Sequence, residues 1–400
     1  MGGGPAGSTA AALVAEAGIK TLLIERHKHP RPHVGESLMP ETYWVFERLG
    51  VLDQLRNSSY PKKVGVQFVN STGKESAPFF FRSHDDRESS QTWHVNRAEF
   101  DKMLFDNASS KGAVCCENTR VLDVFLQDDR ATGVQLQSAD GTMLDVQANV
   151  VIDATGQQTF IASKLGLRRL NPDLRKAAIW SYFRNATRDE EGGGVKTAIL
   201  HTVSKNSWFW YIPQSENIVS VGVVGDRDYL LKGRGIPAKV FAEEQKRCAT
   251  LQNWLAKAQP AGEIQVAKEF SYTTERSAGD GWVLTGDAWG FIDPIYSSGV
   301  YFALKSSQLA ADCVIAGLQC GDVSARTLGS WIPNFTHQTG RIRKLVYAFY
   351  SGEFRVGKFL EEYPQHHNEL VDLLIGRIFD GPTQDIFQDL EPWLAAKRGA

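Results

Sequence analysis

Three glycines at the start of the chain have a spacing that can bind a phosphate group. Gly2, Gly4 and Gly7 form the pattern G-x-G-x-x-G, directly before a run of small residues that predicts a helix. The first glycine of such a pattern permits a tight turn, the second lets backbone N–H groups approach a pyrophosphate, and the third allows close packing. The helix N-terminus then stabilises the anion. We therefore expect a dinucleotide-binding loop, made of Gly2, Gly4, Pro5, Ala6, Gly7 and Ser8.

An acidic residue at the expected distance strengthens this interpretation. Glu25 lies 21 residues after Gly4, at the end of the apolar segment 20–24. In dinucleotide-binding folds, a carboxylate at this position accepts hydrogen bonds from the ribose hydroxyls. We expect Arg26 to line the same site. The alternative is that Glu25 is only an exposed side chain at the end of a strand.

A second carboxylate, Asp287, follows the apolar strand 282–285 and is preceded by Gly286. At a strand end it is well placed to hold the ribityl hydroxyls of a flavin. The segment from Pro294 to Gly299 then leads into a helix whose N-terminus would face the flavin ring, with Val300 in its first turn. The positive potential at a helix N-terminus stabilises an anionic reduced flavin.

Further candidates for the same site come from the middle of the chain. Asp153 and Gly156 end the apolar strand 149–153, in the sequence Asp-Ala-Thr-Gly. Arg97 begins a predicted helix, where it could contact the adenine or ribose side of the cofactor. Val121 lies in a hairpin-rich stretch and is expected to line the site as well. These motifs occur in a fixed order over almost 290 residues, which chance explains poorly.

The elements that must position these residues alternate between strands and helices. Strands are expected around 20–24, 64–69, 79–81, 92–95, 149–153, 176–226 and 282–285, and helices around 9–17, 97–110, 237–258, 299–318 and over most of 327–400. This order predicts an α/β fold class, with an FAD/NAD(P)-binding Rossmann-like three-layer domain, a mixed antiparallel β-sheet substrate domain and a helical C-terminal region.

The predicted cofactor domain is discontinuous. It comprises residues 1–62, 97–175 and 270–325, and the substrate domain comprises 63–96 and 176–269, followed by the helical region 326–400. About five β-forming residues normally precede the first glycine of such a loop, whereas this chain has a single methionine there. We therefore expect the sheet to lack its first strand, which makes stability doubtful.

Composition excludes several other classes of protein. A net charge of -2 gives no reason to expect nucleic acid as a partner, and no stretch approaches the roughly 18 apolar residues of a membrane helix. No secretory signal is evident. The five cysteines are an odd number without metal-like spacing. We expect reduced thiols, no metal site and a cytoplasmic location.

Taken together, the motifs resemble the group A flavin monooxygenase superfamily, which implies FAD rather than NAD as the bound dinucleotide. Two further motifs resemble one branch of it, the flavin-dependent halogenases. Residues 208–213 match the pattern W-x-W-x-I-P, with Trp208 and Trp210 as its tryptophans. Residues 291–299 match F-x-x-P-x-x-S-x-G, with Pro294 and Gly299 at the matching positions.

The resemblance implies a division of roles. In this family reduced FAD, supplied by a separate flavin reductase, reacts with O2 and chloride or bromide to give hypohalous acid. The backbone N–H groups of Ser298 and Gly299 match the family's halide site. The acid travels to a lysine beside the substrate, and K-x-G-x-x-F spacing selects Lys63. Lys63 would either donate a hydrogen bond to hypohalous acid or form a haloamine.

The two tryptophans would separate the flavin from the organic substrate and so suppress hydroxylation. They are two residues apart on a predicted strand and therefore share a face, which is also true of ordinary core tryptophans. Relatives that halogenate tryptophan have a glutamate where this chain has Tyr296. The chain is closer to the branch acting on phenols and pyrroles, some of them tethered to carrier proteins.

Three alternatives remain open from the sequence. One is an FAD-dependent aromatic hydroxylase that uses NAD(P)H directly. Another is a flavoprotein of the geranylgeranyl reductase type, which shares turns such as Gly35-Glu36-Ser37. A third is a truncated fragment without activity.

Overall fold

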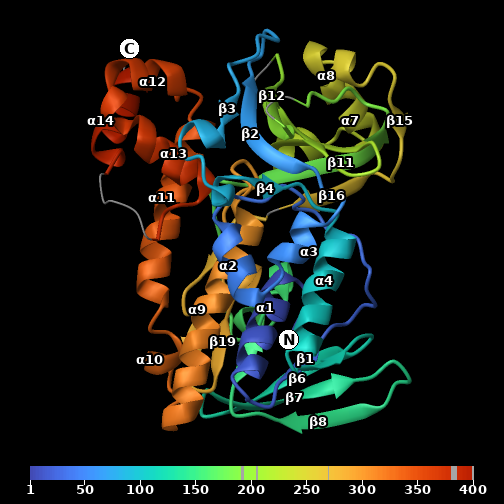
Figure 1. Cartoon of the computed structure of the whole chain (residues 1–400), viewed down its shortest axis with the longest axis vertical. Helices are drawn as coiled ribbons and strands as arrows, with labels where there is room; N and C mark the ends of the chain where they lie inside the picture. The colour runs from blue at the N-terminus through green and yellow to red at the C-terminus, as the bar shows by residue number, and fades with distance from the viewer. Residues whose placement is uncertain (191–192, 204–205, 269, 380–384, 399–400) are drawn as a thin grey trace.

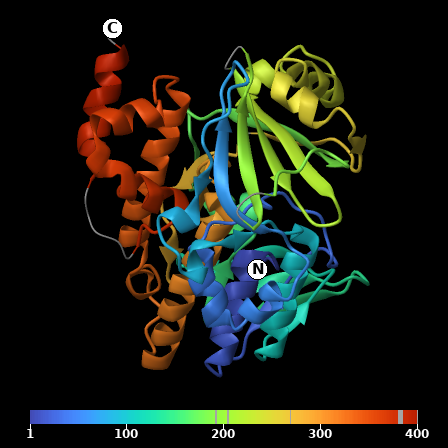
Figure 2. The same ribbon diagram turned by 45° about the horizontal axis from the view of Figure 1, so that its top comes forward.

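The structure is a computed structural model that describes residues 1–190, 193–203, 206–268, 270–379 and 385–398. Its elements form three groups, which Figures 1 and 2 show side by side. One group surrounds the first helix, a second is a large β-sheet, and the third is a set of helices from the C-terminal part of the chain. The predicted α/β fold class is therefore confirmed.

The first group is built around α1 (Pro5–Glu16), which directly follows the glycines. A proline in the first turn and a run of alanines favour this helix. α1 packs against both α4 (Arg97–Ser110) and α9 (Ser298–Cys320), and nearly all its residues are buried. Its small side chains permit this close approach. The helices α2 (Thr42–Leu49) and α3 (Leu52–Arg56) complete the group.

Two small sheets, each containing one parallel pair of strands, flank the start of the chain. β1 (Leu22–Ile24) pairs with β5 (Val114–Cys116), and β9 (Val151–Asp153) pairs with β19 (Trp282–Leu284), which also pairs with β18 (Ala278–Gly279). The residues before α1 join the two sheets. Gly2 N donates to Ile24 O at 2.8 Å, and Ala154 N donates to Met1 O at 2.9 Å. Among the described residues no strand precedes α1.

The remaining elements of this part are short. They are the meander of β6 (Arg120–Gln127), β7 (Arg130–Gln137) and β8 (Met143–Gln147), the sheet of β10 (Arg168–Leu170), β17 (Tyr272–Thr274) and β20 (Gly290–Phe291), the helix α5 (Phe160–Lys164), and the 3-10 turns η3 (Gly156–Gln158) and η4 (Gly286–Ala288). The two 3-10 turns follow β9 and β19 directly, so they stand at the carboxyl ends of two neighbouring parallel strands.

The large sheet has nine strands. Its order is β15 (Gln259–Pro260), β11 (Lys176–Arg184), β14 (Ile218–Asp226), β13 (Ser207–Pro213), β12 (Val195–His201), β2 (Lys62–Val69) and β3 (Phe79–Phe80), with β16 (Gln265–Lys268) beside β11 and β4 (Thr92–Trp93) beside β2. Neighbouring strands are antiparallel except β12 and β2. This parallel pair joins the segment 62–69 to the segment 195–201.

The two faces of this sheet pack against different partners, because side chains alternate along a strand. Phe209 and Ile179 contact the outer helices α7 (Pro237–Gln245) and α8 (Ala249–Trp254) through a separate apolar cluster. Trp208 and Trp210 belong to the main core. The expected single helix over 237–258 is wrong, because Cys248 is extended and separates two helices. The short helix α6 (Arg227–Leu231) follows β14.

The C-terminal helices are α10 (Ala325–Leu328), α11 (Ile332–Tyr350), α12 (Val356–Glu362), α13 (His367–Ile375) and α14 (Phe387–Arg398), with the 3-10 turn η5 (Pro364–His366). α13 packs its Val371 and Ile375 on Phe81, in the 3-10 turn η1 (Phe81–Ser83). Arg377 pairs with Asp85 there, shortly before η2 (Glu88–Ser90). No helix in the described ranges could span a membrane.

The packing of the sheet on the tryptophans gives a first prediction. Gly222 of β14 lies opposite Trp210, and a methyl group added at Gly222 would lie 2.1 Å from the indole ring. We expect Gly222→Ala to lower the free energy of unfolding by about 1–3 kcal/mol, because overpacking displaces the ring. Chemical denaturation measures this change.

Gly340 provides the matched control. It lies inside α11, and a methyl group added there meets no atom within 4 Å. Gly340→Ala should raise the free energy of unfolding by about 0.5–1 kcal/mol, since alanine favours helix. An unchanged stability in Gly222→Ala would contradict the packing described here.

Candidate active site

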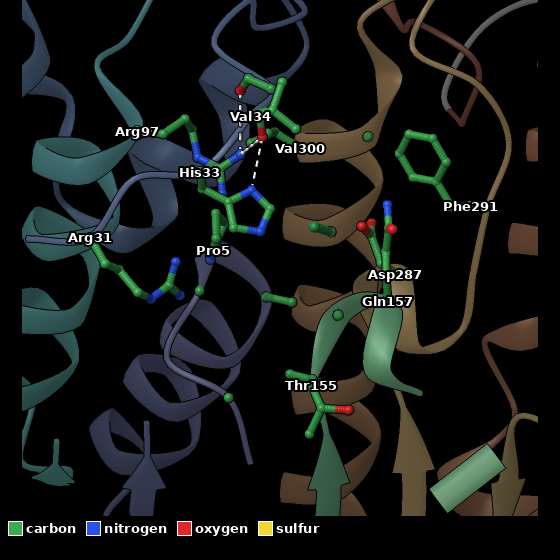
Figure 3. Close-up of a pocket in the computed structure, with 18 of the residues that line it drawn as sticks. Pro5, Arg31, His33, Val34, Arg97, Thr155, Gln157, Asp287, Phe291 and Val300 are labelled. Atoms are coloured by element: carbon green, nitrogen blue, oxygen red, sulfur yellow. Dashed lines mark hydrogen bonds between the residues drawn. The ribbon is translucent and has the colours of Figure 1, made fainter. Parts of the chain in front are cut away.

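One pocket gathers most of the residues predicted to bind a cofactor (Figure 3). It is lined by backbone and side chains from α1, from the segment 24–37, from both 3-10 turns after the parallel strands, and from the beginning of α9. The predicted residues that line it are Gly2, Gly4, Pro5, Ala6, Glu25, Arg26, Arg97, Val121, Gly156, Asp287, Pro294, Gly299, Val300 and Trp210.

The glycine loop forms one end of the pocket. A Cβ atom on Gly2 would lie 2.3 Å from Ala154 O, and one on Gly7 would lie 1.8 Å from Gly2 O. Gly2 also has a positive φ of 96°, which favours glycine. Gly7 and Ser8 do not line the pocket. They lie behind the loop, where the Ser8 hydroxyl donates to Gly3 O at 3.3 Å.

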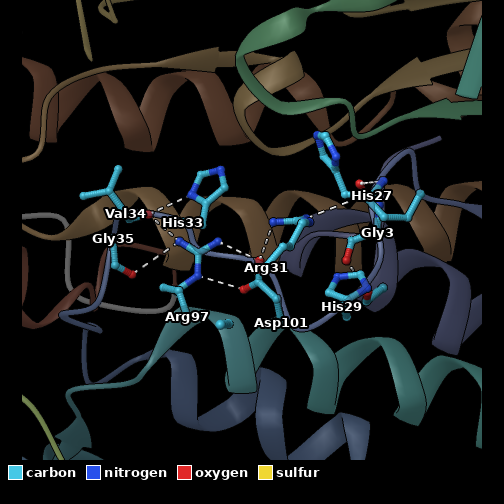
Figure 4. A network of polar contacts seen from close by, with 12 residues as sticks. Gly3, His27, His29, Arg31, His33, Val34, Gly35, Arg97 and Asp101 are labelled. Carbon is cyan, nitrogen blue, oxygen red and sulfur yellow. Dashed lines mark hydrogen bonds and ion pairs between the residues drawn. The ribbon is translucent and has the colours of Figure 1, made fainter. Parts of the chain in front are cut away.

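A chain of alternating charges runs beside this loop (Figure 4). Arg31 pairs with Glu25 at 3.3 Å and with Asp101 at 3.2 Å, and Asp101 in turn pairs with Arg97 at 2.8 Å. Burial disfavours the ionised form of Glu25, yet Arg31 and the N–H groups of His27 and Gly3 hold its pKa below the usual value. Glu25 is thus a carboxylate that faces the pocket.

Arg31 was not predicted from the sequence. Its Nη2 lies 3.5 Å from the position of a Cβ on Gly4, so its guanidinium stands over the glycine loop. Among the described residues its buried Nε–H has no hydrogen-bond partner. A partly buried cation with an unsatisfied donor beside a helix N-terminus fits the pyrophosphate of a dinucleotide. The only sequence signal was its place in a turn rich in Pro and His.

Asp153 supports the site from behind. Its carboxylate accepts hydrogen bonds from Thr155 N at 3.0 Å and Ile161 N at 2.7 Å, so it holds the turn after β9 and does not line the pocket. Arg26 reaches the same turn from the other side, because its Nη1 donates to Gln158 at 3.0 Å.

Asp287 lines the pocket beside the turn after β9, next to Gln157 and Phe291 in Figure 3. Burial raises its pKa from 3.8 to about 6, against the opposing effect of Arg97. Gly286 has a φ of 59° and lies behind it, with its N–H donating to Ser306 at 2.9 Å. Arg97, expected at the adenine or ribose side, therefore lies close enough to Asp287 to act on it electrostatically.

The beginning of α9 forms the floor near Asp287. Ser297 precedes the helix with a φ of 59°, and Gly299 and Pro294 line the pocket. Ser298 is buried and does not line it. A Cβ on Gly299 would lie 2.9 Å from the Phe291 ring, so glycine lets this ring pack on the first turn. The N-terminus of this long helix can stabilise an anion.

The two tryptophans take different positions. Trp210 lines the pocket, and its indole N–H donates to Ser220 at 3.1 Å. Trp208 lies behind it, with ring centroids 6.5 Å apart, and donates to the hydroxyl of Tyr350 at 3.0 Å. Tyr350 in turn donates to the buried carboxyl of Asp293, whose pKa burial raises to about 7. Only one tryptophan of the pair therefore reaches the pocket.

Lys63 lies outside this pocket. It is 2% exposed, its Nζ donates to Leu38 O at 2.8 Å, and the Phe81 ring lies 5.6 Å away. Burial lowers the pKa of Lys63 from 10.5 to about 7, so part of the population is a neutral amine at neutral pH. Ser37, which precedes Leu38 in the sequence, lines the pocket. The segment Ser37–Leu38 therefore lies between the pocket and Lys63.

The sequence of the chain is similar to those of known FAD-binding proteins. The FAD binding domain family matches residues 1–310. The 1H-pyrrole-2-carbonyl-(peptidyl-carrier protein) chlorinase of Pseudomonas fluorescens is 30% identical over 422 residues, covering 99% of this chain and 92% of the chlorinase. The corresponding brominase of Pseudoalteromonas luteoviolacea is 31% identical over 325 residues, covering 80% of this chain and 78% of the brominase.

A solved structure agrees with these relatives. The flavin-dependent brominase Bmp2 matches with a TM-score of 0.88 at 27% identity, covering 100% of this chain and 98% of the brominase. The chain thus belongs to the FAD-binding domain family and, within it, to the flavin-dependent halogenases. It is an FAD-dependent enzyme that uses a halide, as predicted, rather than a hydroxylase or a reductase. The roles of single residues stay predictions.

Asp287→Asn tests the flavin end of the pocket. Between pH 3.8 and about 6 the folded protein binds more protons than the unfolded chain, so its stability falls as the pH rises. We expect the FAD-free variant to be about 2–3 kcal/mol more stable than the wild type at pH 8 and nearly equal at pH 4. Denaturant titration at both pH values measures this.

The same variant should bind FAD at least about tenfold more weakly, because it loses a charged acceptor. Flavin fluorescence titration gives the affinity. Asp86→Asn, at an exposed position away from the pocket, should change neither quantity. Wild-type FAD affinity in Asp287→Asn would rule out the proposed contact.

Proposed function

We propose that this halogenase acts on a pyrrole-2-carbonyl group tethered to a carrier protein, with reduced FAD supplied by a separate flavin reductase. The similarity to a chlorinase named for that substrate, along 99% of the chain, supports the substrate class. A brominase named for the same substrate adds to it. Because one relative is a chlorinase and the other a brominase, the proposal includes both halides.

The observation that carries the proposed mechanism is the burial of Lys63 behind the wall of the pocket. Its Nζ bonds to Leu38 O, and its lowered pKa makes the neutral amine available near pH 7. When bound, reduced FAD supplies with O2 the two-electron oxidation that converts a halide to hypohalous acid. Lys63 then holds this acid by a hydrogen bond or as a haloamine, beside the aromatic ring.

The pocket residues divide the remaining tasks. Glu25 accepts hydrogen bonds from the ribose hydroxyls, and Asp287 accepts them from the ribityl hydroxyls. Arg31 and the start of α1 hold the pyrophosphate. The N–H groups of Ser298 and Gly299 bind the halide at the start of α9. Trp210 fills the space between the pocket and the sheet, which keeps the organic substrate away from the flavin.

The surroundings of Lys63 suit a substrate on a long arm. The Phe81 ring, 5.6 Å from Lys63 Nζ, is 1% exposed because Val371 and Ile375 of α13 pack against it. A ring on a flexible tether can enter such an enclosed site while the carrier stays at the surface. Tyr296 replaces the glutamate of the tryptophan-specific relatives and donates to Leu345 O at 3.3 Å, so it offers no carboxylate to the substrate. An electron-rich pyrrole needs less activation by the enzyme.

The role of Lys63 is tested by a pair of adjacent variants. Lys63→Ala should reduce halogenation by at least about a hundredfold while flavin oxidation continues, because only the second step needs the amine. Lys62 precedes it on β2 but is exposed, so Lys62→Ala should retain halogenation. Product is measured by mass spectrometry and flavin oxidation by absorbance. Full halogenation by Lys63→Ala would contradict the proposed role of Lys63.

The substrate class is tested by direct competition. The purified protein is supplied with a flavin reductase, NADH, FAD, O2 and either chloride or bromide, and is offered carrier-bound pyrrole-2-carboxylate, the free acid and a panel of phenols. We expect halogen to appear on the carrier-bound ring and not on the free acid. Halogenation of free phenols alone would refute the tethered substrate. Omitting the reductase should abolish the reaction, whereas a hydroxylase would still consume NADH.

A further inference from the structure

A chain of buried hydroxyl groups connects the pocket to the neighbourhood of Lys63. The Ser297 hydroxyl donates to Ser37 Oγ at 3.1 Å, Ser37 Oγ lies 2.8 Å from Thr197 Oγ1, and Thr197 Oγ1 lies 2.8 Å from His94 Nε2. Ser297, Ser37 and Thr197 line the pocket, whereas His94 is fully buried. These four residues, called the hydroxyl chain below, come from four separate segments of the sequence.

The partner of the second His94 nitrogen sets the direction of the hydroxyl chain. His94 Nδ1 lies 2.8 Å from Pro213 O, and a carbonyl oxygen can only accept, so Nδ1 carries the hydrogen. Burial and the nearby Lys63 charge lower the pKa of His94 to about 3, which keeps the ring neutral. Nε2 is therefore an acceptor. Thr197 must donate to it, Ser37 must donate to Thr197, and Ser297 donates to Ser37.

The direction of the hydroxyl chain determines whether Ser297 Oγ donates or accepts a hydrogen bond in the pocket. The only hydrogen of its hydroxyl is donated to Ser37, so Ser297 Oγ can only accept a hydrogen bond from a molecule in the pocket that Ser297 lines. An oxygen that can only accept repels a halide ion but binds the O–H group of hypohalous acid. The backbone N–H groups at the start of α9, next to Ser297, have the opposite preference. The two kinds of group thus distinguish the halide from its oxidised product.

The hydroxyl chain also touches the segment that holds Lys63. Ser37 is followed by Leu38, whose carbonyl accepts from Lys63 Nζ at 2.8 Å. The backbones of Ser37 and His94 form a β-bridge, and Thr92, two residues before His94, pairs with Lys63 across β4 and β2. Ser297 and Lys63 are therefore connected through the hydrogen-bonded backbone of Ser37–Leu38, β4 and β2.

We propose that the hydroxyl chain receives hypohalous acid at Ser297 and orients it for passage past Ser37 and Thr197 toward Lys63. This inference rests on the proposed function. The passage itself breaks no covalent bond, because the O–H of the acid only donates to Ser297 Oγ. Beside Lys63 the aromatic C–H and HO–X then give C–X and one water, so the ring proton and the hydroxide leave together. Ser37, Thr197 and His94 are positioning residues.

The direction of the hydroxyl chain is tested first, on the FAD-free protein. Nitrogen-15 NMR of labelled histidines distinguishes protonated from unprotonated ring nitrogens, and His94→Gln identifies the signals by their loss. We expect His94 to have a protonated Nδ1 and an unprotonated Nε2 at pH 7. Thr197→Val, which keeps the shape but removes the hydroxyl, should shift the Nε2 signal. A protonated Nε2 in the wild type would overturn the proposed direction.

The passage is tested by the coupling between flavin oxidation and product. In Thr197→Val we expect halogenated product per oxidised flavin to fall roughly tenfold, the effect of one lost hydrogen bond. A thiol trap should collect the released hypohalous acid in place of the missing product, and both are counted per flavin oxidised. Product coupling equal to the wild type would overturn the role of the hydroxyl chain.

Thr202→Val is the matched control. Thr202 directly follows β12, and its buried hydroxyl donates to Ser207 O at 2.9 Å, outside the hydroxyl chain. It should keep wild-type coupling, and an equal loss there would show a general effect of the substitution and count against the proposal. A wild type that yields neither product nor trapped acid would overturn the proposed function, while the NMR result would still decide the direction of the chain.

Discussion

The close approach of Gly7 to the carbonyl of Gly2 is the constraint on which the cofactor pocket depends. Side chains at these positions would lie 1.8 Å from Gly2 O and 2.3 Å from Ala154 O, so only glycine lets helix, loop and strand end meet. The same loop is bonded to Ile24 on one side and to Ala154 on the other. The meeting point brings Glu25 and the turn after β9 to one end of the pocket.

The buried charged groups in and around the pocket differ in how far an opposite charge compensates them. Asp101 and Glu25 are neutralised by the arginines between and beside them. Asp287 and Lys63 are buried with less compensation, and burial shifts their pKa values to about 6 and about 7. Such groups oppose folding, and a shifted pKa in a cleft marks a candidate for ligand binding or catalysis. Both stand where the proposed chemistry needs them.

Side chains alternate between the two faces of the large sheet, so one face lines the pocket and the other packs against the outer helices. Trp210 and Thr197 line the pocket from β13 and β12, whereas Phe209 packs under the outer helices. The parallel pairing of β12 with β2 brings Lys63 next to Val195, close to Thr197. The strands that form the wall of the pocket and the strand that carries Lys63 are therefore parts of the same sheet. Hypohalous acid would have only a short distance to travel between them.

Patterns within a few residues of each other were readable from the sequence. The spacing of the glycines, the acid at the end of the next strand and the shared face of Trp208 and Trp210 follow from helix and strand geometry alone. The break at Cys248 was missed, because the apolar pattern continues across it while the backbone does not. Asp153 was placed at the correct strand end, but its carboxylate bonds to its own turn.

Contacts between distant segments could not be predicted in this way. Arg31 meets Asp101 across 70 residues, His94 meets Thr197 across 103, and Ser297 meets Ser37 across 260. The sequence by itself determined the family, the cofactor and the residue types of the site, because these depend on local spacing. Only the tertiary structure decided which side chains face the pocket and which support it, because burial and hydrogen-bond partners depend on how remote segments pack.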